Sequence, residues 1–230
     1  VLPNGVKKGV MLTLFKYTYS IPDYLVVHTK KMYQQLIDDF DVPAEKIRLM
    51  EHGIEPLAET SYPRKENDVF NILFFGYITE YKGLDLLLDA LLYSREQYQL
   101  TIVGRCNSKK LKERIAQQIS AHPARKSIFW RDDYIAEEEV SHVFYGADMV
   151  VLPYRNIYQS GVLFQALRYG VPKLASDVGS FSEYVHPELG KLFKSGDAND
   201  LAQKLDEMIK TRGLFSSITI QEYAKNYSWP

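Results

Sequence analysis

The sequence predicts an α/β domain built on a doubly wound parallel sheet, and three observations predict it. Short apolar segments alternate with helical patterns along residues 70–210. Two of these segments end in glycine, at Gly76 and Gly104, where loops would leave the sheet. The connections are short, as in parallel sheets whose helices cover both faces. A strand–helix–strand pattern before residue 57 predicts part of a second α/β domain.

The first sixty residues read as strand, helix and strand. Residues 23–29 ("DYLVVHT") and 46–54 ("KIRLMEHGI") are the two apolar segments, and Thr29 is placed to cap the helix between them. Residues 57–69 are polar and aperiodic, which indicates a linker. We therefore expect an incomplete domain over residues 1–56 and a complete one over residues 70–230.

The regular part of the chain is predicted to hold five strands and five helices. The strands are residues 70–76, 99–104, 127–130, 148–153 and 172–176. The helices cover residues 84–92, 111–119, 136–146, 162–169 and a segment that begins at Asp197. The helix over 162–169 is apolar nearly all round, so we expect it to be buried.

Composition narrows the class of protein. The chain has 230 residues, a formal net charge of -1 and no long run of like charge, which argues against a nucleic-acid partner. A single cysteine, Cys106, excludes an internal disulfide. No segment reaches the ~18 apolar residues that a membrane span needs, and no signal peptide is evident. We expect a cytoplasmic protein, represented by a fragment because the sequence opens without methionine.

Chemistry is expected beyond the carboxyl ends of the strands, where such sheets bind ligands. Lys82 and Arg105 offer positive charge in two of the loops there, and glycines let the backbone approach a ligand. The helix that begins at Ser160–Gly161 presents free N–H groups and the positive end of its dipole, which favours an anion. A plain cap by Ser160 is the alternative.

Common phosphate-binding motifs are missing. Neither the loop at Gly76 nor the loop at Gly104 gives G-x-G-x-x-G, and G-x-x-x-x-G-K-[ST] is absent. Ordinary dehydrogenases and P-loop NTPases are therefore poor fits.

Several segments together resemble a known family. They are "FFGYITEYKGLDLLLDAL", "LTIVGR", "DDYIAEEEVSHVFYGADMVVLPYRNIYQSGVLFQALRYGVPKLASDVGSFSEYV" and "GKLFKSGDANDLAQKL". In order and spacing they resemble the second domain of retaining GT-B glycosyltransferases of the bacterial glycosyl transferases group 1 type. Upstream, "DYLVVHTKKMYQQLIDDF" and "KIRLMEHGIEP" resemble the end of the first domain. These enzymes make capsule, lipopolysaccharide and exopolysaccharide.

The resemblance implies two Rossmann-like domains with a nucleotide-diphospho-sugar between them, and hexosyl transfer to a glycan or lipid-linked acceptor. It implies retention of configuration, and neither a metal nor a further cofactor. UDP- or GDP-sugars are the expected donors, and the acceptor-side groups, a histidine among them, would precede Val1. Residues 5–20 predict an ordinary domain helix, with peripheral contact at the inner face of the membrane as the alternative.

By position, the resemblance assigns Lys82 to the departing diphosphate. It assigns donor binding to Gly76, Tyr77, Thr79, Arg105, Asp133, Tyr134, Ile135, Tyr158, Gln159, Ser160, Gly161, Val162 and Gln165. Among these, residues 133–135 correspond to the loop that holds the base by backbone contacts. The turn at 158–162 corresponds to the segment whose amides hold the donor phosphate and sugar.

The sequence departs from the family pattern at several positions. Tyr77 and Thr79 stand where an arginine is usual, and Ile157 and Gln165 stand where many members carry two glutamates that touch the sugar and the ribose. An amide can still bind a ribose, whereas isoleucine cannot replace a carboxylate. Two alternatives therefore stay open: a non-catalytic nucleotide-sugar-binding relative, and a GT-B-type nucleotide-sugar epimerase.

Other polar residues favour structural roles. His28 and His52 end apolar strands, with a cleft contact at His52 as the alternative. Asp132 and Asp133 are a weak metal pair without a third ligand. Three glutamates at 137–139 indicate a solvated first turn of a helix. Cys106 lies beside Arg105, and a reactive thiol there is the less favoured interpretation.

Overall fold

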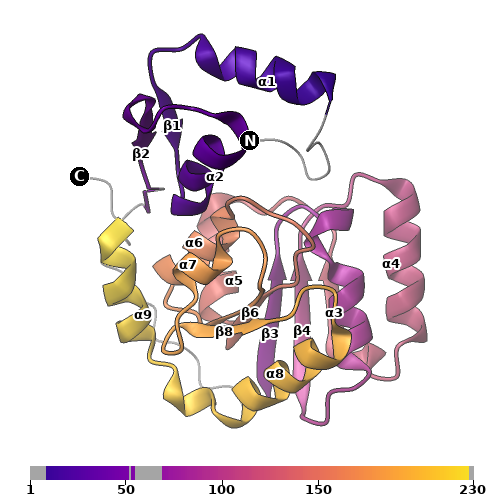
Figure 1. The fold of residues 1–230 in the computed structure, drawn as a ribbon. Coiled ribbons are helices and arrows are strands. Elements are labelled where there is room, and N and C mark those ends of the chain that lie inside the picture. The colour runs from indigo at the N-terminus through magenta and orange to yellow at the C-terminus, as the bar shows by residue number, and fades with distance from the viewer. Residues whose placement is uncertain (1–8, 52, 55–68, 228–230) are drawn as a thin grey trace. The chain divides into compact units, whose positions relative to one another are not determined.

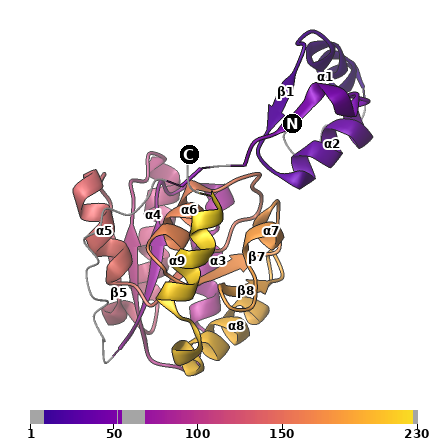
Figure 2. The same cartoon turned by 90° about the vertical axis from the view of Figure 1, so that its left-hand side faces the viewer.

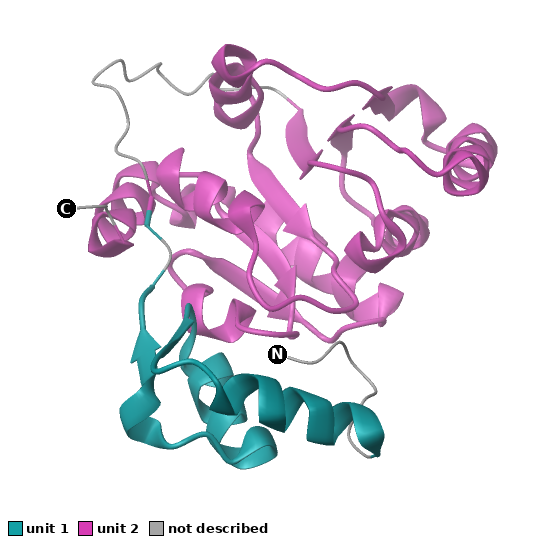
Figure 3. Ribbon diagram, turned by 90° about the horizontal axis from the view of Figure 1, so that it is seen from above, with its two compact units in different colours: residues 1–53 teal, residues 54–230 magenta. Residues whose placement is uncertain are grey.

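The computed structural model describes residues 9–51, 53–54 and 69–227. The chain divides into two compact units, residues 1–53 and 54–230 (Figure 3). Each unit is described by itself. The predicted linker over residues 57–69 lies, apart from Val69, outside the described residues, as does His52.

The first unit has the predicted strand–helix–strand pattern, preceded by a helix that lies within the segment 5–20 for which a domain helix was predicted. Its elements are α1 (Val10–Ser20), β1 (Leu25–Val27), α2 (Lys30–Phe40) and β2 (Ile47–Leu49), and the two strands pair in parallel. The Thr29 hydroxyl accepts a hydrogen bond from the Met32 N–H at 3.1 Å, which confirms the predicted cap. The core of this unit is Val27, Leu36, Phe40, Val42 and Ile47.

The second unit is built on a six-stranded, entirely parallel sheet (Figure 1). Its strands are β3 (Phe70–Phe75), β4 (Tyr98–Val103), β5 (Ile128–Arg131), β6 (Met149–Leu152), β7 (Lys173–Ser176) and β8 (Gly190–Phe193). Their order across the sheet is β5-β4-β3-β6-β7-β8. Counted from β3, this is the 3-2-1-4-5-6 order of doubly wound sheets, so the predicted fold class is confirmed.

Helices cover both faces of the sheet (Figures 1 and 2). One face buries leucines and isoleucines of α3 (Leu84–Leu91), α4 (Lys109–Ala121) and α8 (Ala198–Lys210). The other face buries mainly aromatic and aliphatic side chains of α5 (Glu137–Tyr145), α6 (Gly161–Arg168), α7 (Phe181–Tyr184) and α9 (Ser217–Ala224). Along β3, Ile72 and Phe74 belong to the first core and Leu73 to the second, as strand alternation requires.

Two parts of the second unit differ from the sequence prediction. A sixth strand, β8, was not predicted, because its only apolar side chains are Leu192 and Phe193, which are too short a run to indicate a strand. The structure also has the helix α9, which is followed by the 3-10 turn Lys225–Tyr227, whereas the predicted helices stopped at the one beginning at Asp197. Only Ile220 and Ala224 of α9 are buried, so its sequence has little helical periodicity.

Candidate functional site

The strand order determines where a ligand can enter. The sheet reverses its direction of growth between β3 and β6, so the loops that follow these two strands lie next to each other at the carboxyl edge. The Arg155 N–H donates to the Tyr81 carbonyl at 2.7 Å and joins the two loops directly. The edge beside this junction holds most of the predicted site residues.

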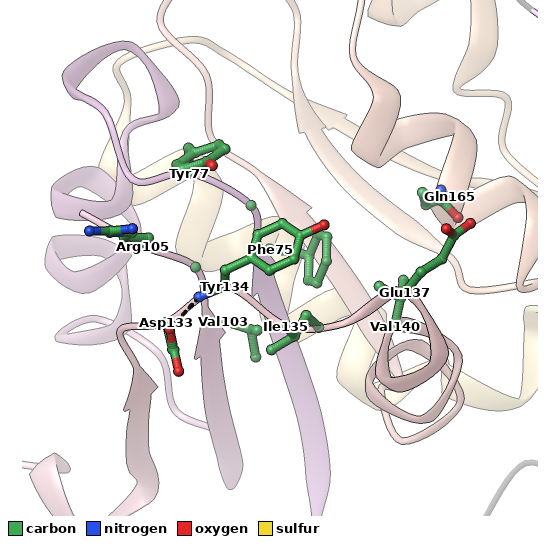
Figure 4. Close-up of a pocket in the computed structure, with 12 residues that line it drawn as sticks. Phe75, Tyr77, Val103, Arg105, Asp133, Tyr134, Ile135, Glu137, Val140 and Gln165 are labelled. Carbon is green, nitrogen blue, oxygen red and sulfur yellow. Dashed lines mark hydrogen bonds between the residues drawn. The ribbon is translucent and has the colours of Figure 1, made fainter. Parts of the chain in front are cut away.

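A cleft of about 300 Å³ opens at this edge (Figure 4). It is lined by Phe75, Gly76, Tyr77, Val103, Gly104, Arg105, Asp133, Tyr134, Ile135, Glu137, Val140 and Gln165. Seven of the predicted binding residues are among these: Gly76, Tyr77, Arg105, Asp133, Tyr134, Ile135 and Gln165. Apolar groups together with a few polar ones are typical of a site for a flat organic ligand.

Two tyrosines stand at the cleft with most of their side chains in solvent. Tyr77 is 54% exposed and Tyr134 is 69% exposed. Asp133 Oδ1 accepts a hydrogen bond from the Tyr134 N–H at 2.8 Å, which holds this loop in a local turn. Ile135 is buried and anchors the loop from below. The aromatic rings are therefore available to a planar ligand.

Two loops meet at Gly76 and Gly104. Gly104 has φ of +154°, and a Cβ added to it would lie 2.0 Å from the Gly76 carbonyl oxygen. No side chain can be placed between these backbones, so the glycine is required for the cleft to have this shape.

Gly104→Ala is expected to reduce the free energy of unfolding by about 2–3 kcal/mol, because backbone must move to admit a methyl group. Gly196→Ala is the matched control: it has φ of +79° but no atom within 4 Å of an added Cβ. The control should cost about 1–2 kcal/mol, from its positive φ alone. Urea denaturation of both variants measures the difference, and equal losses would contradict the argument.

Lys82 lies just outside the cleft, beyond Gly76. It ends the 3-10 turn Glu80–Lys82, only 7% of it is exposed, and a Cβ added to Gly76 would lie 2.7 Å from its Nζ. Within the described residues no carboxylate lies within ion-pair distance of its ammonium, which stands 5.7 Å from the centroid of the Tyr154 ring. Burial lowers the pKa of Lys82 to about 8. A buried cation without a carboxylate partner is suited to an anionic ligand.

The first turn of α6 lies beside Lys82. The Ser160 hydroxyl accepts from the Leu163 N–H at 3.3 Å, so the plain cap is present. The N–H groups of Gly161 and Val162 have no acceptor within the helix. Val162 Cγ2 would lie 3.5 Å from a Cβ at Gly76, which places this turn beside Lys82. The cap and an anion site are therefore compatible at this helix end.

The Arg155 side chain connects the loops that follow β3 and β6. Its guanidinium donates to both carboxylate oxygens of Asp85, at 2.9 and 2.8 Å, and to the Glu80 carbonyl at 2.6 Å. Burial raises the pKa of Asp85, but the hydrogen bond and charge of Arg155 outweigh it, so the pKa lies below its usual value. The bidentate pair holds the turn that carries Lys82 against the loop that follows strand β6.

The other predicted residues do not line the cleft. The Thr79 hydroxyl and the Gln159 amide nitrogen are buried and have no hydrogen-bond partner among the described residues. The Tyr158 carbonyl accepts from the Ser180 hydroxyl at 2.6 Å. These contacts neither support nor oppose their assignment to donor binding, which stays a prediction.

Sequence reasoning missed part of the lining. Phe75, Val103 and Val140 complete the apolar surface, and Glu137 adds a carboxylate from the start of α5. The three glutamates at 137–139 are exposed, as predicted for a solvated turn, but their positions are not equivalent. Glu139 pairs with Arg131 at 2.8 Å, whereas Glu137 lines the cleft. The sequence held only one indication that Glu137 lines the cleft: it follows the loop at 133–135 by two residues.

The alternative polar candidates have structural contacts. Asp132 accepts from the Cys106 N–H at 2.7 Å and pairs with Lys112, and in the described part of the chain no group of three metal-ligating side chains occurs. Cys106 is buried, and burial raises the pKa of its thiol. His28 Nδ1 lies 2.7 Å from the Met50 carbonyl oxygen.

Comparison with known proteins identifies the family. The model of the family described as glycosyl transferases group 1 matches residues 69–211, more than half of the chain. The chain belongs to this family. The matched residues contain the whole cleft, Lys82 and the first turn of α6.

Two curated relatives share low sequence identity with this chain or match only part of it. An uncharacterized glycosyltransferase, MJ1607, of Methanocaldococcus jannaschii is 23% identical over 96% of this chain and 60% of its own length. The GDP-mannose:glycolipid 4-beta-D-mannosyltransferase of Xanthomonas campestris pv. campestris is 31% identical over 45% of this chain and 29% of its own length. The chain thus spans about 60% of the length of the first of these relatives.

Solved structures share the fold. Sucrose-phosphate synthase from Thermosynechococcus elongatus covers 100% of this chain with a TM-score of 0.82 at 20% identity, and 60% of its own chain is matched. The lipopolysaccharide outer core galactosyltransferase WaaB covers 94% with a TM-score of 0.76 at 18% identity, and 62% of it is matched. HepE of Anabaena, solved with UDP-glucose, covers 94% with a TM-score of 0.78 at 17% identity, and 63% of it is matched. The chain has the α/β fold of GT-B glycosyltransferases.

Across the residues that the structure describes, no helix has both the length and the apolar character that crossing a bilayer requires.

Proposed function

We propose that this chain binds the nucleotide-diphospho-sugar donor of a glycosyltransferase that transfers a hexosyl group with retention and without a metal. The observation that carries the proposal is the buried Lys82 ammonium. It lies at the junction of the cleft and the first turn of α6, with no carboxylate of the described residues near enough to neutralise it. A nucleoside diphosphate has the matching parts: a planar base, a sugar and two negatively charged phosphates.

The same groups would assist the chemistry. When the bond between the sugar and the diphosphate breaks, negative charge grows on the departing phosphate oxygen. The Lys82 ammonium and the amides of Gly161 and Val162 are held in place before that charge develops, so they stabilise it without rearrangement. Retention and metal independence follow the resemblance to GT-B enzymes of the retaining kind, and the preorganised cation supports the second of these.

The nucleotide and the acceptor remain proposals drawn from similar proteins. The relative in Xanthomonas is named for GDP-mannose and glycolipid, and HepE is solved with UDP and UDP-glucose. These names support UDP- or GDP-sugars as donors and a glycan or lipid-linked acceptor. Peripheral contact with the inner, cytoplasmic face of a membrane is supported by exposed apolar residues along α1: Val10, Leu14 and Tyr17.

Thermal unfolding of the 230-residue chain with UDP, GDP, ADP and TDP tests the donor site. A nucleotide at 100 times its dissociation constant should add about 2.7 kcal/mol to the free energy of unfolding and raise the melting temperature. One base should give the largest shift, since the groups at the cleft are fixed. If none of the four nucleotides shifts the transition, the proposed donor site is wrong.

A non-catalytic relative is the second candidate, and Ile157 favours it. This residue stands where many members of the family carry a glutamate, and its side chain packs against the core of the second unit. A protein of this kind would bind the nucleotide sugar in the thermal assay but release no sugar. Release or transfer of sugar from the radiolabelled donor by the full-length protein, lost in Lys82→Ala, would favour the enzyme, and no release would favour the non-catalytic relative.

A further inference from the structure

The polar groups of the cleft are divided between its two ends. Arg105 and Asp133 lie at one end, and Glu137 and Gln165 lie at the other (Figure 4). Apolar side chains of Phe75 and Ile135 lie between them. A ligand that fills the cleft therefore meets a carboxylate and a carboxamide together, at the end formed by α5 and α6.

The spacing along α6 relates this end to the anion site. Val162 belongs to the first turn of the helix, and Gln165 is three residues further on the same face. Such neighbours have Cβ atoms roughly 5–6 Å apart, which is about the separation of a phosphate from the hydroxyls of the ribose attached to it. A nucleotide whose diphosphate lies beside Lys82 and Val162 would thus place its ribose near Gln165.

The chemistry at this end suits a vicinal diol. Gln165 Oε1 is buried and has no hydrogen-bond partner among the described residues, so one acceptor is already positioned. A carboxylate adds two more acceptor oxygens, and two hydroxyl donors are what a ribose presents. Glu139, two residues along α5, is held by Arg131 at 2.8 Å, whereas no ion pair of Glu137 occurs among the described residues.

We propose that Glu137 recognises the ribose hydroxyls of the nucleotide and makes the site selective for ribonucleotides; this inference rests on the proposed donor site. Glu137 and Gln165 form a pair of acceptors contributed by two helices. The carboxylate comes from the first residue of α5, the helix that follows the loop at 133–135. Selectivity for the ribose thus depends on how α5 and α6 pack.

The test is titration calorimetry of UDP, GDP and their 2′-deoxy counterparts against the wild-type chain and two variants. Glu137→Ala should weaken binding of the ribonucleotide by about tenfold to a hundredfold, the usual loss for a hydrogen bond to a charged group. Binding of the 2′-deoxy nucleotide, which keeps only the 3′-hydroxyl, should weaken several-fold less than that of the ribonucleotide. Glu138→Ala is the matched control, because it removes the same charge from the same helix turn but does not line the cleft.

The outcomes are separable. Equal losses for ribo- and deoxyribonucleotides, or a loss no greater than that of Glu138→Ala, would overturn the role of Glu137 while the donor site stands. If neither UDP nor GDP binds the wild-type chain, the donor site fails and this inference fails with it. Circular dichroism of each variant establishes that the fold is intact.

Discussion

Lys82→Ala is expected to lower the rate of sugar transfer by about 100- to 1000-fold, the loss found when one preorganised donor to a developing oxyanion is removed. It should also remove most of the affinity for a nucleoside diphosphate. The cause is the loss of the one ammonium that the described structure places at Gly76 and the first turn of α6. Nucleotide titration of this chain measures the affinity, and transfer assays of the full-length protein measure the rate.

The pH dependence of diphosphate affinity tests whether the charge of Lys82 is responsible for binding. Because burial lowers the pKa of Lys82 to about 8, diphosphate affinity should fall as the pH rises through this value. Lys82→Arg should keep binding nearly constant over the same range, since a guanidinium stays protonated. Lys110→Ala removes an equal charge from the exposed start of α4 and should leave binding unchanged. A Lys82→Ala variant with unaltered affinity would refute the assignment.

Lys173→Met is expected to raise the free energy of unfolding by about 1–4 kcal/mol near pH 6, the gain seen when buried charges are replaced by apolar groups of similar volume. Lys173 stands at the start of β7 and is fully buried. Its ammonium has no hydrogen-bond partner among the described residues. Burial lowers its pKa to about 7. An unpaired charge at this position opposes folding.

The lowered pKa of Lys173 also determines how the free energy of unfolding depends on pH. Between pH 7 and 10.5 the unfolded chain holds a proton on this lysine that the folded chain has released, so wild-type stability rises with pH through this window. From pH 6 to 9 the contribution is about 3 kcal/mol. The methionine variant should lack this rise, so its advantage shrinks at pH 9. Chemical denaturation at pH 6 and 9 measures it.

Lys191→Met is the matched control for this experiment. Lys191 lies on the neighbouring strand β8, is partly exposed and pairs with Glu207 at 2.8 Å. Removing it should change stability by no more than about 1 kcal/mol, as for other pairs near the surface. If Lys173→Met is no more stable than wild type at pH 6, the buried amine has a partner that compensates its charge.

The sequence was sufficient for those parts of the fold that carry strong apolar periodicity. The helix at 162–169 was predicted to be buried, and Leu163, Phe164, Ala166 and Leu167 are buried. The strand β8 and the helix α9 were missed because each buries too few apolar residues to show a period. Strand order had no local signal, since it depends on how distant segments pair.

The candidate site was predictable where loops follow strands, and less so where helices contribute. Gly76, Arg105 and Asp133 come directly from the ends of strands, and all three line the cleft. Glu137 was read as one of three equivalent solvated glutamates. Only the packing of α5 against the sheet places it beside Gln165, and that packing is set by contacts that its own sequence does not reveal.

The hydrogen bonds of Arg155 have a consequence for nucleotide selectivity. Because the bonds to Asp85 and the Glu80 carbonyl fix the turn of Lys82 before any ligand arrives, the phosphate end gains no discrimination from loop ordering. In the proposed donor site, Lys82 and the first turn of α6 should therefore hold the diphosphate of every nucleotide alike. Choice among bases should then depend on cleft residues such as Tyr77 and Tyr134, whose side chains extend into solvent, and substitutions there should change the preferred base without altering how the diphosphate is held.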